Sequence, residues 1–142
     1  MMTNQIRVFS AHERFHQLEG KIIRAIKKTL SFLKKQGLVL EVYLVGDRIM
    51  RKLNLKFKKK NKTTNVLSFP ALSPLIFREP KLDRRFNHLG EIYLNPDYIS
   101  RKQENLEAML IHGLLHLLGF DHKNKFQAAK MERLEEKLLD KL

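Results

Sequence analysis

The segment Glu104–His122 reads ENLEAMLIHGLLHLLGFDH and combines a strong helical pattern with three histidines. Residues Glu104–Leu118 predict a helix rich in leucine, isoleucine and methionine. Gly119 predicts the end of that helix, because glycine adopts the left-handed conformation that stops a helix and reverses the chain. We therefore expect a helix that ends in a glycine turn, with a histidine just beyond the turn.

The three histidines of this segment predict a divalent metal site, with zinc as the preferred ion. His112 and His116 are four residues apart, so on a helix both imidazoles project from one face and reach one ion at roughly 2.0–2.1 Å. The reversal at Gly119 brings His122 to the same ion. Three histidine ligands leave a fourth position for water, which is typical of a catalytic zinc site. Imidazoles also accept nickel, copper or iron, and histidines four residues apart also occur on helices without a metal.

The histidine spacing equals that of the metzincin peptidases, H-E-x-x-H-x-x-G-x-x-H, with one difference. Those enzymes use the glutamate after the first histidine as a general base, and Gly113 occupies that position here. Peptide hydrolysis is therefore disfavoured, whereas chemistry that depends on metal polarisation, such as phosphodiester cleavage, remains open. Asp121 either fixes a histidine tautomer from behind or stabilises the turn through its own backbone bonds.

Hydrophobic patterns in the rest of the chain predict an α+β fold in one domain, residues 1–142, with a small mixed sheet of about four strands and about five helices. The expected strands are Gln5–Phe9, Leu38–Val45, Asn65–Phe69 and Glu91–Leu94. Besides Glu104–Leu118, the expected helices cover Leu18–Leu33, Ile49–Leu55, Asp97–Arg101 and the tail from Asn124. Residues 71–88 predict a long surface loop in which Arg78, Arg84 and Arg85 widen a basic surface.

The composition is strongly basic and free of cysteine. The chain has 28 Lys and Arg against 15 Asp and Glu, a net charge of +13, and its pI is about 10.1. Such a field attracts polyanions, so nucleic acid is the favoured partner, although lysines also serve solubility. The lack of cysteine excludes disulfides and thiolate metal sites. No signal peptide and no run of roughly 18 apolar residues is recognisable, so we expect a soluble protein without a membrane partner.

Lysines are concentrated between Lys56 and Lys62, and we expect them to contact a phosphate backbone. Residues Phe57–Lys62 of this run predict a basic loop. The alternative is a solvated lysine loop. Phe57 lies within it and is expected to pack in the core rather than stack on a base. Asn65 either hydrogen-bonds a substrate or only starts the next strand. Ser68 is interpreted as a strand hydroxyl, because no base is spaced for it as a nucleophile.

Taken together, these motifs resemble the YbeY family, bacterial metal-dependent endoribonucleases of ribosomal RNA maturation. The family hallmark H-G-x-L-H-L-x-G-[YF]-D-H is matched at every fixed position by His112–His122. Residues 53–58 are similar to the family's L-N-x-x-[YF]-R, residues 64–70 to T-[DN]-V-L-S-F-P, and residues 89–92 to L-G-D-I. Ala128, Met131 and Glu135 match the spacing that follows the last histidine. The resemblance covers nearly the whole chain.

The resemblance implies a cytoplasmic, single-strand-specific endoribonuclease that acts in 16S rRNA 3′-end maturation and ribosome quality control. The implied partners are ribosomal RNA, the small ribosomal subunit and assembly factors. One zinc ion is implied at His112, His116 and His122. Lys58, at the position of the family's arginine, is the implied catalytic residue. The basic run, rather than the resemblance, predicts substrate contacts at Lys56, Lys59 and Lys60, and Asn65 is a further candidate contact.

Two residues depart from the family pattern. Lys58 stands where the family has arginine, and it keeps the charge but loses the bidentate fork that suits phosphate. Glu91 replaces the usual aspartate, which matters if that carboxylate orients a group near the metal. Two other functions stay open: a metallohydrolase or peptidase with metzincin-like site geometry, and a ribosome-binding assembly factor in which zinc stabilises the fold.

Overall fold

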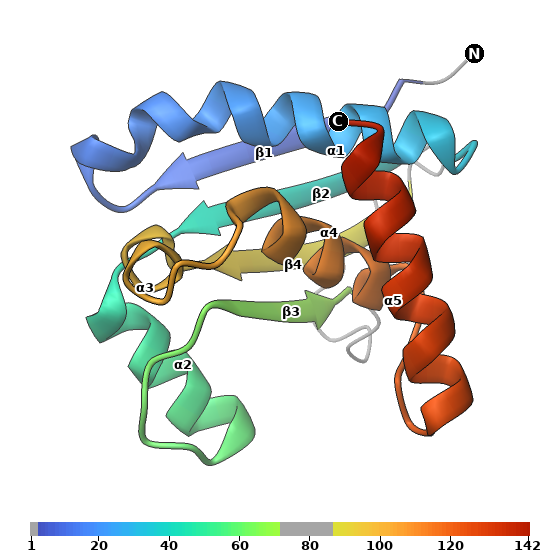
Figure 1. Ribbon diagram of the computed structural model, residues 1–142. Coiled ribbons are helices and arrows are strands. Elements are labelled where there is room, and N and C mark those ends of the chain that lie inside the picture. The colour runs from blue at the N-terminus through green and yellow to red at the C-terminus, as the bar shows by residue number, and fades with distance from the viewer. Residues whose placement is uncertain (1–2, 72–86) are drawn as a thin grey trace.

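Four strands form one mixed sheet in the computed structural model, which describes residues 3–71 and 87–142 (Figure 1). The strands lie in the order β1-β2-β4-β3, with bounds β1 Gln5–Ser10, β2 Leu38–Leu44, β4 Asn87–Leu94 and β3 Val66–Pro70. β1, β2 and β4 are parallel, whereas β3 pairs antiparallel with β4 at one edge of the sheet. The predicted α+β fold with a small mixed sheet is confirmed.

Two of the helices cover one face of this sheet. The described ranges contain five α-helices: α1 Glu19–Phe32, α2 Asp47–Lys58, α3 Pro96–Arg101, α4 Leu106–Leu117 and α5 Lys125–Asp140. A 3-10 helix, Glu13–Leu18, precedes α1 and was not predicted. Every second side chain of β2 is buried, because α1 and α4 lie over that face (Figure 1). The alternation of residues in the sequence of β2 therefore matches the side chains that face the helices.

Helix α4 is the central helix of the fold, with α1, α5, β3 and β4 as neighbours. This position explains why it is apolar on nearly all sides. Leu110 and Leu114 are buried in the core against the sheet, whereas Ile111 and Leu115 pack with Met131 of α5. Met131 is therefore a packing residue, as predicted.

The structure corrects the predicted loop after α2. The helix continues through Phe57 and Lys58, so the basic loop begins only at Lys59, where the backbone turns left-handed with φ 61°. The predicted core position of Phe57 is wrong, because its side chain is 52% exposed. Its ring packs beside that of Phe69, with 4.9 Å between the centroids.

The last two residues of the predicted loop over residues 71–88 belong to a strand instead. β4 begins at Asn87, ahead of the predicted start at Glu91, because it pairs with β2 along the whole length of that strand. Arg78, Arg84 and Arg85 lie outside the described residues. In the described part of the chain, no helix is long and apolar enough to cross a membrane.

Candidate metal centre

The three predicted metal-binding histidines converge at the end of α4. His112 and His116 project from the same side of the helix, and their Nε2 atoms are 3.1 Å apart. Ring centroids are 4.6 Å apart for His112 and His116, 5.1 Å for His116 and His122, and 6.0 Å for His112 and His122. Two nitrogens on one tetrahedral zinc ion are about 3.3 Å apart, given the usual bond lengths. The donor set and its spacing therefore fit a zinc ion.

The turn after α4 brings His122 back toward the helix. Gly119 has φ 97°, a backbone conformation that residues with a Cβ rarely adopt. Its N–H donates to the carbonyl of His116 at 3.1 Å. Asp121 then accepts the backbone N–H of His122 at 2.7 Å, so the turn is stabilised locally as well. The predicted glycine stop after the helix is present at the expected residue.

Asp121 is also placed to act as a metal ligand. Potential ligand atoms of His116, Asp121 and His122 all lie within 4.8 Å of one another, which makes them the candidate metal group among the described residues. His112 is not in this group, although its Nε2 contacts that of His116. The arrangement thus supplies four potential donors, and it adds a carboxylate to the three predicted histidines.

Glu135 of α5 supports His112 from behind. Its Oε1 lies 2.7 Å from Nδ1 of His112, and both side chains are partly buried. A carboxylate at Nδ1 fixes the tautomer and leaves Nε2 available as a ligand. The sequence reasoning matched Glu135 only by its spacing and assigned it no role. The available signal was its position one helical turn after the buried Met131, which places it on the side of α5 that faces α4.

The surroundings of His116 favour the neutral form that metal binding requires. Burial is the main cause that lowers the pKa of His116, and the neighbouring His112 and His122 add to the effect. A neutral imidazole retains the lone pair that a metal ion needs.

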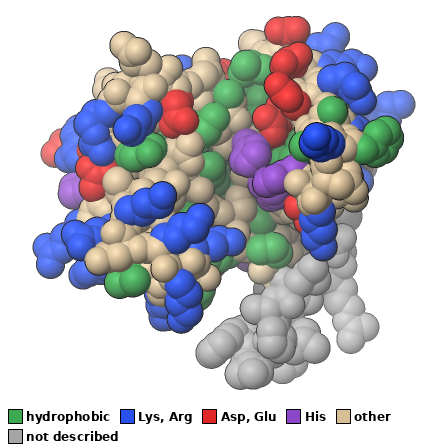
Figure 2. Space-filling view, turned by 60° about the horizontal axis from the view of Figure 1, so that its bottom comes forward, with side chains coloured by type: hydrophobic (Ala, Val, Ile, Leu, Met, Phe, Trp, Pro, Cys, Tyr) green, Lys and Arg blue, Asp and Glu red, His purple; other side chains and the backbone are tan. Residues whose placement is uncertain are grey.

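A cleft of about 640 Å³ lies beside the three histidines, and Lys58 and Asn65 also line it. Figure 2 shows histidine side chains in a hollow, with Lys and Arg side chains on both sides of it. Lys58 is the last residue of α2 and brings the positive charge predicted for the site. The other predicted lysines, Lys56, Lys59 and Lys60, are exposed but do not line the described cleft.

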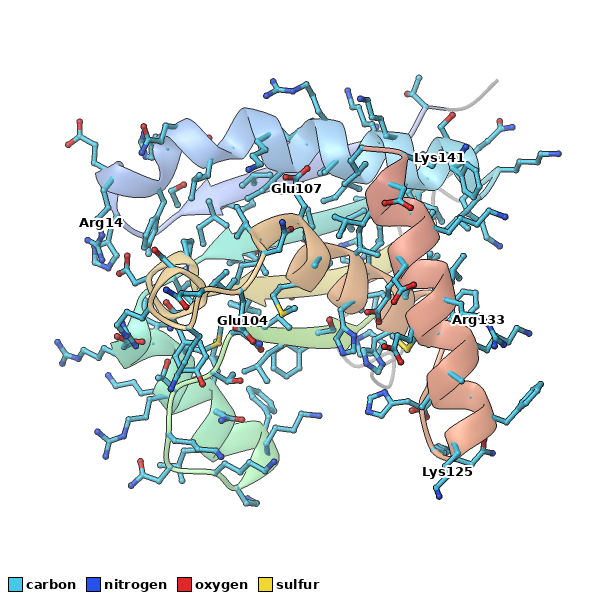
Figure 3. The ribbon with its side chains drawn as sticks, viewed as in Figure 1. Arg14, Glu104, Glu107, Lys125, Arg133 and Lys141 are labelled. Carbon is cyan, nitrogen blue, oxygen red and sulfur yellow. The ribbon has the colours of Figure 1, made fainter. Side chains whose placement is uncertain are left out.

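The side chain of Asn65 is already engaged by the protein. Its Oδ1 accepts the N–H of Val66 at 2.7 Å, and its Nδ2 donates to Glu104 at 3.2 Å and to the sulfur of Met109 at 3.2 Å. Glu104, labelled in Figure 3, comes from the segment just before α4 and lines the same cleft. Asn65 therefore helps to join the start of β3 to α4, and it also faces the cleft.

Gly113 faces the sheet and leaves no room for a side chain. A Cβ there would lie 2.9 Å from Oγ of Ser68, 3.1 Å from Val66 and 3.3 Å from Ile92. Ser68 also donates to the carbonyl of Gly113 at 2.9 Å, which agrees with its interpretation as a strand hydroxyl. The position of the metzincin base is thus used for close packing of α4 on β3 and β4.

Glu91 has a local partner away from the cleft. Its Oε2 accepts the hydroxyl of Tyr93 at 2.8 Å, and burial together with this bond raises the pKa of Tyr93. Glu41 on the neighbouring strand accepts the hydroxyl of Tyr43 in the same way at 2.9 Å. Glu91 is not among the residues that line the described cleft, so the structure gives it a partner on its own strand.

Comparisons with known proteins agree over the whole chain. A family model described as Endoribonuclease YbeY matches residues 2–142. The Endoribonuclease YbeY of Thermodesulfovibrio yellowstonii is 36% identical, with 99% of each chain covered. That of Bartonella quintana is 35% identical and covers 100% of this chain and 94% of its own. The solution structure of a Thermotoga maritima protein has a similar fold, with TM-score 0.55 and 23% identity over 96% of this chain and 90% of that one.

Proposed function

Since the chain belongs to the endoribonuclease YbeY family, we propose that it is a zinc-dependent endoribonuclease that cleaves single-stranded RNA in the cleft beside His112, His116 and His122. The observation that carries the proposal is that this cleft is lined both by three metal-binding side chains and by Lys58. Metal ligands and a cation in one cleft suit a phosphodiester substrate.

Each site residue has a distinct task in this proposal. A zinc ion at the three histidines would supply Lewis-acid polarisation of a phosphoryl oxygen and activation of water. Glu135 keeps the proton of His112 on Nδ1, and burial keeps His116 neutral, so both present a lone pair to the cleft. The ammonium of Lys58 neutralises charge on the phosphate that the cleft holds.

We assign the remaining predicted contacts to the approach of the RNA. Lys56, Lys59 and Lys60 lie next to Lys58 at the end of α2 and add positive charge at the edge of the cleft. Asn65 lines the cleft and orients the start of β3, where it reaches both Glu104 and the backbone. The net charge of +13 supports a polyanionic substrate.

We place the reaction in 16S rRNA 3′-end maturation and ribosome quality control in the cytoplasm, with the small ribosomal subunit and its assembly factors as partners. Family membership and the basic charge support this placement.

The test is a cleavage assay on a precursor 16S rRNA fragment, with metal content measured on the same samples. We expect metal-loaded wild type to cleave the RNA, and His116→Ala to lose the metal and fall to background cleavage. Lys58→Ala should keep the metal and lose about 100-fold in rate, whereas Lys58→Arg should keep activity. His16→Ala is the matched control, because His16 is exposed on the 3-10 helix. The proposal fails if the wild type leaves the RNA intact, as His116→Ala does.

An assembly factor with a structural zinc site is the second candidate, and Asp121 is the observation that favours it. If Asp121 is a ligand together with the three histidines, the tetrahedral site is closed and lacks a position for water. Asp121→Asn separates the two functions. An open catalytic site should keep its metal and its cleavage in this variant, whereas a closed site should lose metal affinity and unfold at lower temperature.

A further inference from the structure

A second concave surface lies on the other side of α2 from the histidine cleft. This groove has a volume of about 870 Å³, and five cations line it: Arg48, Arg51, Lys52, Lys62 and Arg101. Three of them lie on α2 at steps of three and four residues, so they share one face of the helix. The opposite face carries the buried Met50 and Asn54. The outward face of α2 is therefore a basic stripe.

Apart from Arg101, the cations of the groove have no acidic partner among the residues that the structure describes. The carboxylate in its lining is Asp47, which Arg101 holds with two contacts of 2.9 and 3.1 Å. Asn95 donates to the same carboxylate at 2.8 Å. Asp47 is thus occupied, while no described ion pair includes Arg48, Lys52 or Lys62.

Arg51 is oriented by Asn61, which lines the groove from the segment between α2 and β3. Nε of Arg51 donates to Oδ1 of Asn61 at 2.7 Å, which leaves the terminal nitrogens of its planar fork free to bind an anion. Asn61 and Lys62 belong to the segment that leads into β3, and Asn65 of the same segment lines the histidine cleft. Helix α2 and the segment between α2 and β3 therefore contribute to both the groove and the cleft, although the two have no lining residue in common.

We propose that this groove binds the phosphates of the RNA strand next to the portion held in the histidine cleft, an inference that rests on the proposed endoribonuclease function. Helix α2 carries Lys58 of the cleft at its end and Arg48 of the groove near its start. At 1.5 Å per residue these positions are about 15 Å apart along the helix, the length of roughly four stacked nucleotides at 3.4 Å each. An RNA strand that leaves the cleft along α2 meets the groove, and guanidinium forks suit its phosphates.

The test compares long and short strands, because only a long strand reaches from the cleft to the groove. The double variant Arg48→Gln/Lys52→Gln removes two exposed cations of the groove, and Lys27→Gln/Lys28→Gln removes two exposed cations of α1 as the matched control. Binding of fluorescent single-stranded DNA of about 12 and about 3 nucleotides is measured against salt concentration with the metal-loaded protein. DNA is used as the probe because an endoribonuclease does not cut it. DNA should still bind to the groove, because the groove contacts phosphates rather than sugars.

For the long strand, the groove variant should lower the slope of log affinity against log salt by about 1.4, since each phosphate contact on a single strand contributes about 0.7. The control pair should leave the slope unchanged, and neither pair should affect the short strand. Lys62→Gln, from the other wall, should lower the slope by about 0.7 on its own. An unchanged slope in the groove variants, or an equal decrease in the control, would overturn the inference. So would equally tight binding of a polyglutamate peptide, which would point to an acidic protein instead.

A measurement of RNA cleavage with the same variants distinguishes a failure of this inference from a failure of the proposed function. With RNA of about 12 nucleotides the groove variant should raise KM several-fold at unchanged kcat, and with about 3 nucleotides it should change neither constant. If the wild type cleaves RNA and the groove variants bind and cleave as it does, the groove inference fails and the proposed function stands. If the wild type cleaves no RNA, the proposed function fails, and the DNA measurement still decides whether the groove binds phosphates.

Discussion

Helices α4 and α2 border the same cleft, but they are attached to the protein in different ways. Helix α4 is packed by α1, α5 and the sheet, and half of its residues are buried and none is exposed. Helix α2 buries only Met50 and Asn54, and polar contacts hold its two ends. Asp47 binds Arg101 and Asn95 at its start, and Nδ2 of Asn54 donates to the carbonyl of Lys62 near its end.

The difference matches what each helix contributes. Metal ligands must be held within a few tenths of an ångström, and a helix enclosed on several sides provides that precision. Contacts to phosphates depend on charge more than on exact placement, so lysines and arginines on an exposed helix are sufficient. For metal binding and stability, changes around α4 should therefore have large effects, and changes at the polar attachment of α2 small ones.

The largest effect is expected at the carboxylate behind α4. Glu135→Gln should weaken metal binding by about 10- to 100-fold, because His112 loses the charged partner that fixes its tautomer. A competition titration with a chromophoric chelator measures this affinity. Glu136→Gln is the control, since Glu136 is exposed and the structure gives it no contact with a histidine. Equal affinities for the wild type and Glu135→Gln would show that α5 does not help to position the ligand.

The next effect concerns the close packing of α4 on the sheet. Gly113→Ala should lower the free energy of unfolding by about 1–3 kcal/mol, because its Cβ would lie 2.9 Å from Oγ of Ser68. Urea unfolding followed by circular dichroism measures the change. Gly20→Ala in α1 is the matched control, because its Cβ would meet only the flexible end of Arg24 and alanine favours the helix. If Gly113→Ala is as stable as the wild type, the packing of α4 is looser than described.

The smallest effect is expected at the polar attachment of α2, and it depends on pH. The hydrogen bonds from Arg101 are the main cause that lowers the pKa of Asp47 from 3.8 to about 2. A carboxyl whose pKa is lower in the folded state stabilises that state above its unfolded pKa, and this contribution is lost as the pH falls from about 4 toward 2. Because the side chain of Asp47 is 45% exposed, solvent screening limits the contribution to about 1 kcal/mol or less.

Thermal unfolding of Asp47→Asn at several pH values tests this attachment. The variant should be less stable than the wild type at pH 7, and the difference should shrink as the pH falls from 4 to 2. Asp140→Asn, at the exposed end of α5, should show no such dependence. A difference that stays constant down to pH 2 would contradict the assignment.

The sequence predicted the features that depend on neighbouring residues. The period of two in β2, the apolar pattern of α4 and the glycine after it are all local, and the structure contains each of them. The family motif assigned Lys58 to the catalytic site, but its predicted position in a loop was wrong. The run of lysines gave no apolar pattern from which the last turn of α2 could be predicted.

The features that sequence reasoning missed depend on contacts between distant segments. Glu135 reaches His112 only because α5 packs along α4, and the helix that carries it, with its ends near Lys125 and Lys141, is shown in Figure 3. The packing role of Gly113 depends on β3, which is far from it in the chain. The groove on α2 likewise needs the segment around Asn61 as its second wall.

The glycine turn after α4 also bears on the order of events during folding. His112, His116 and His122 fall within eleven residues, so bringing them together closes only a short loop and costs little chain entropy. Lys58 joins them only after β3 and β4 have paired and α4 has docked on the sheet. We therefore expect the three histidines to come near one another early in folding, and the cleft that also includes Lys58 to be completed only later.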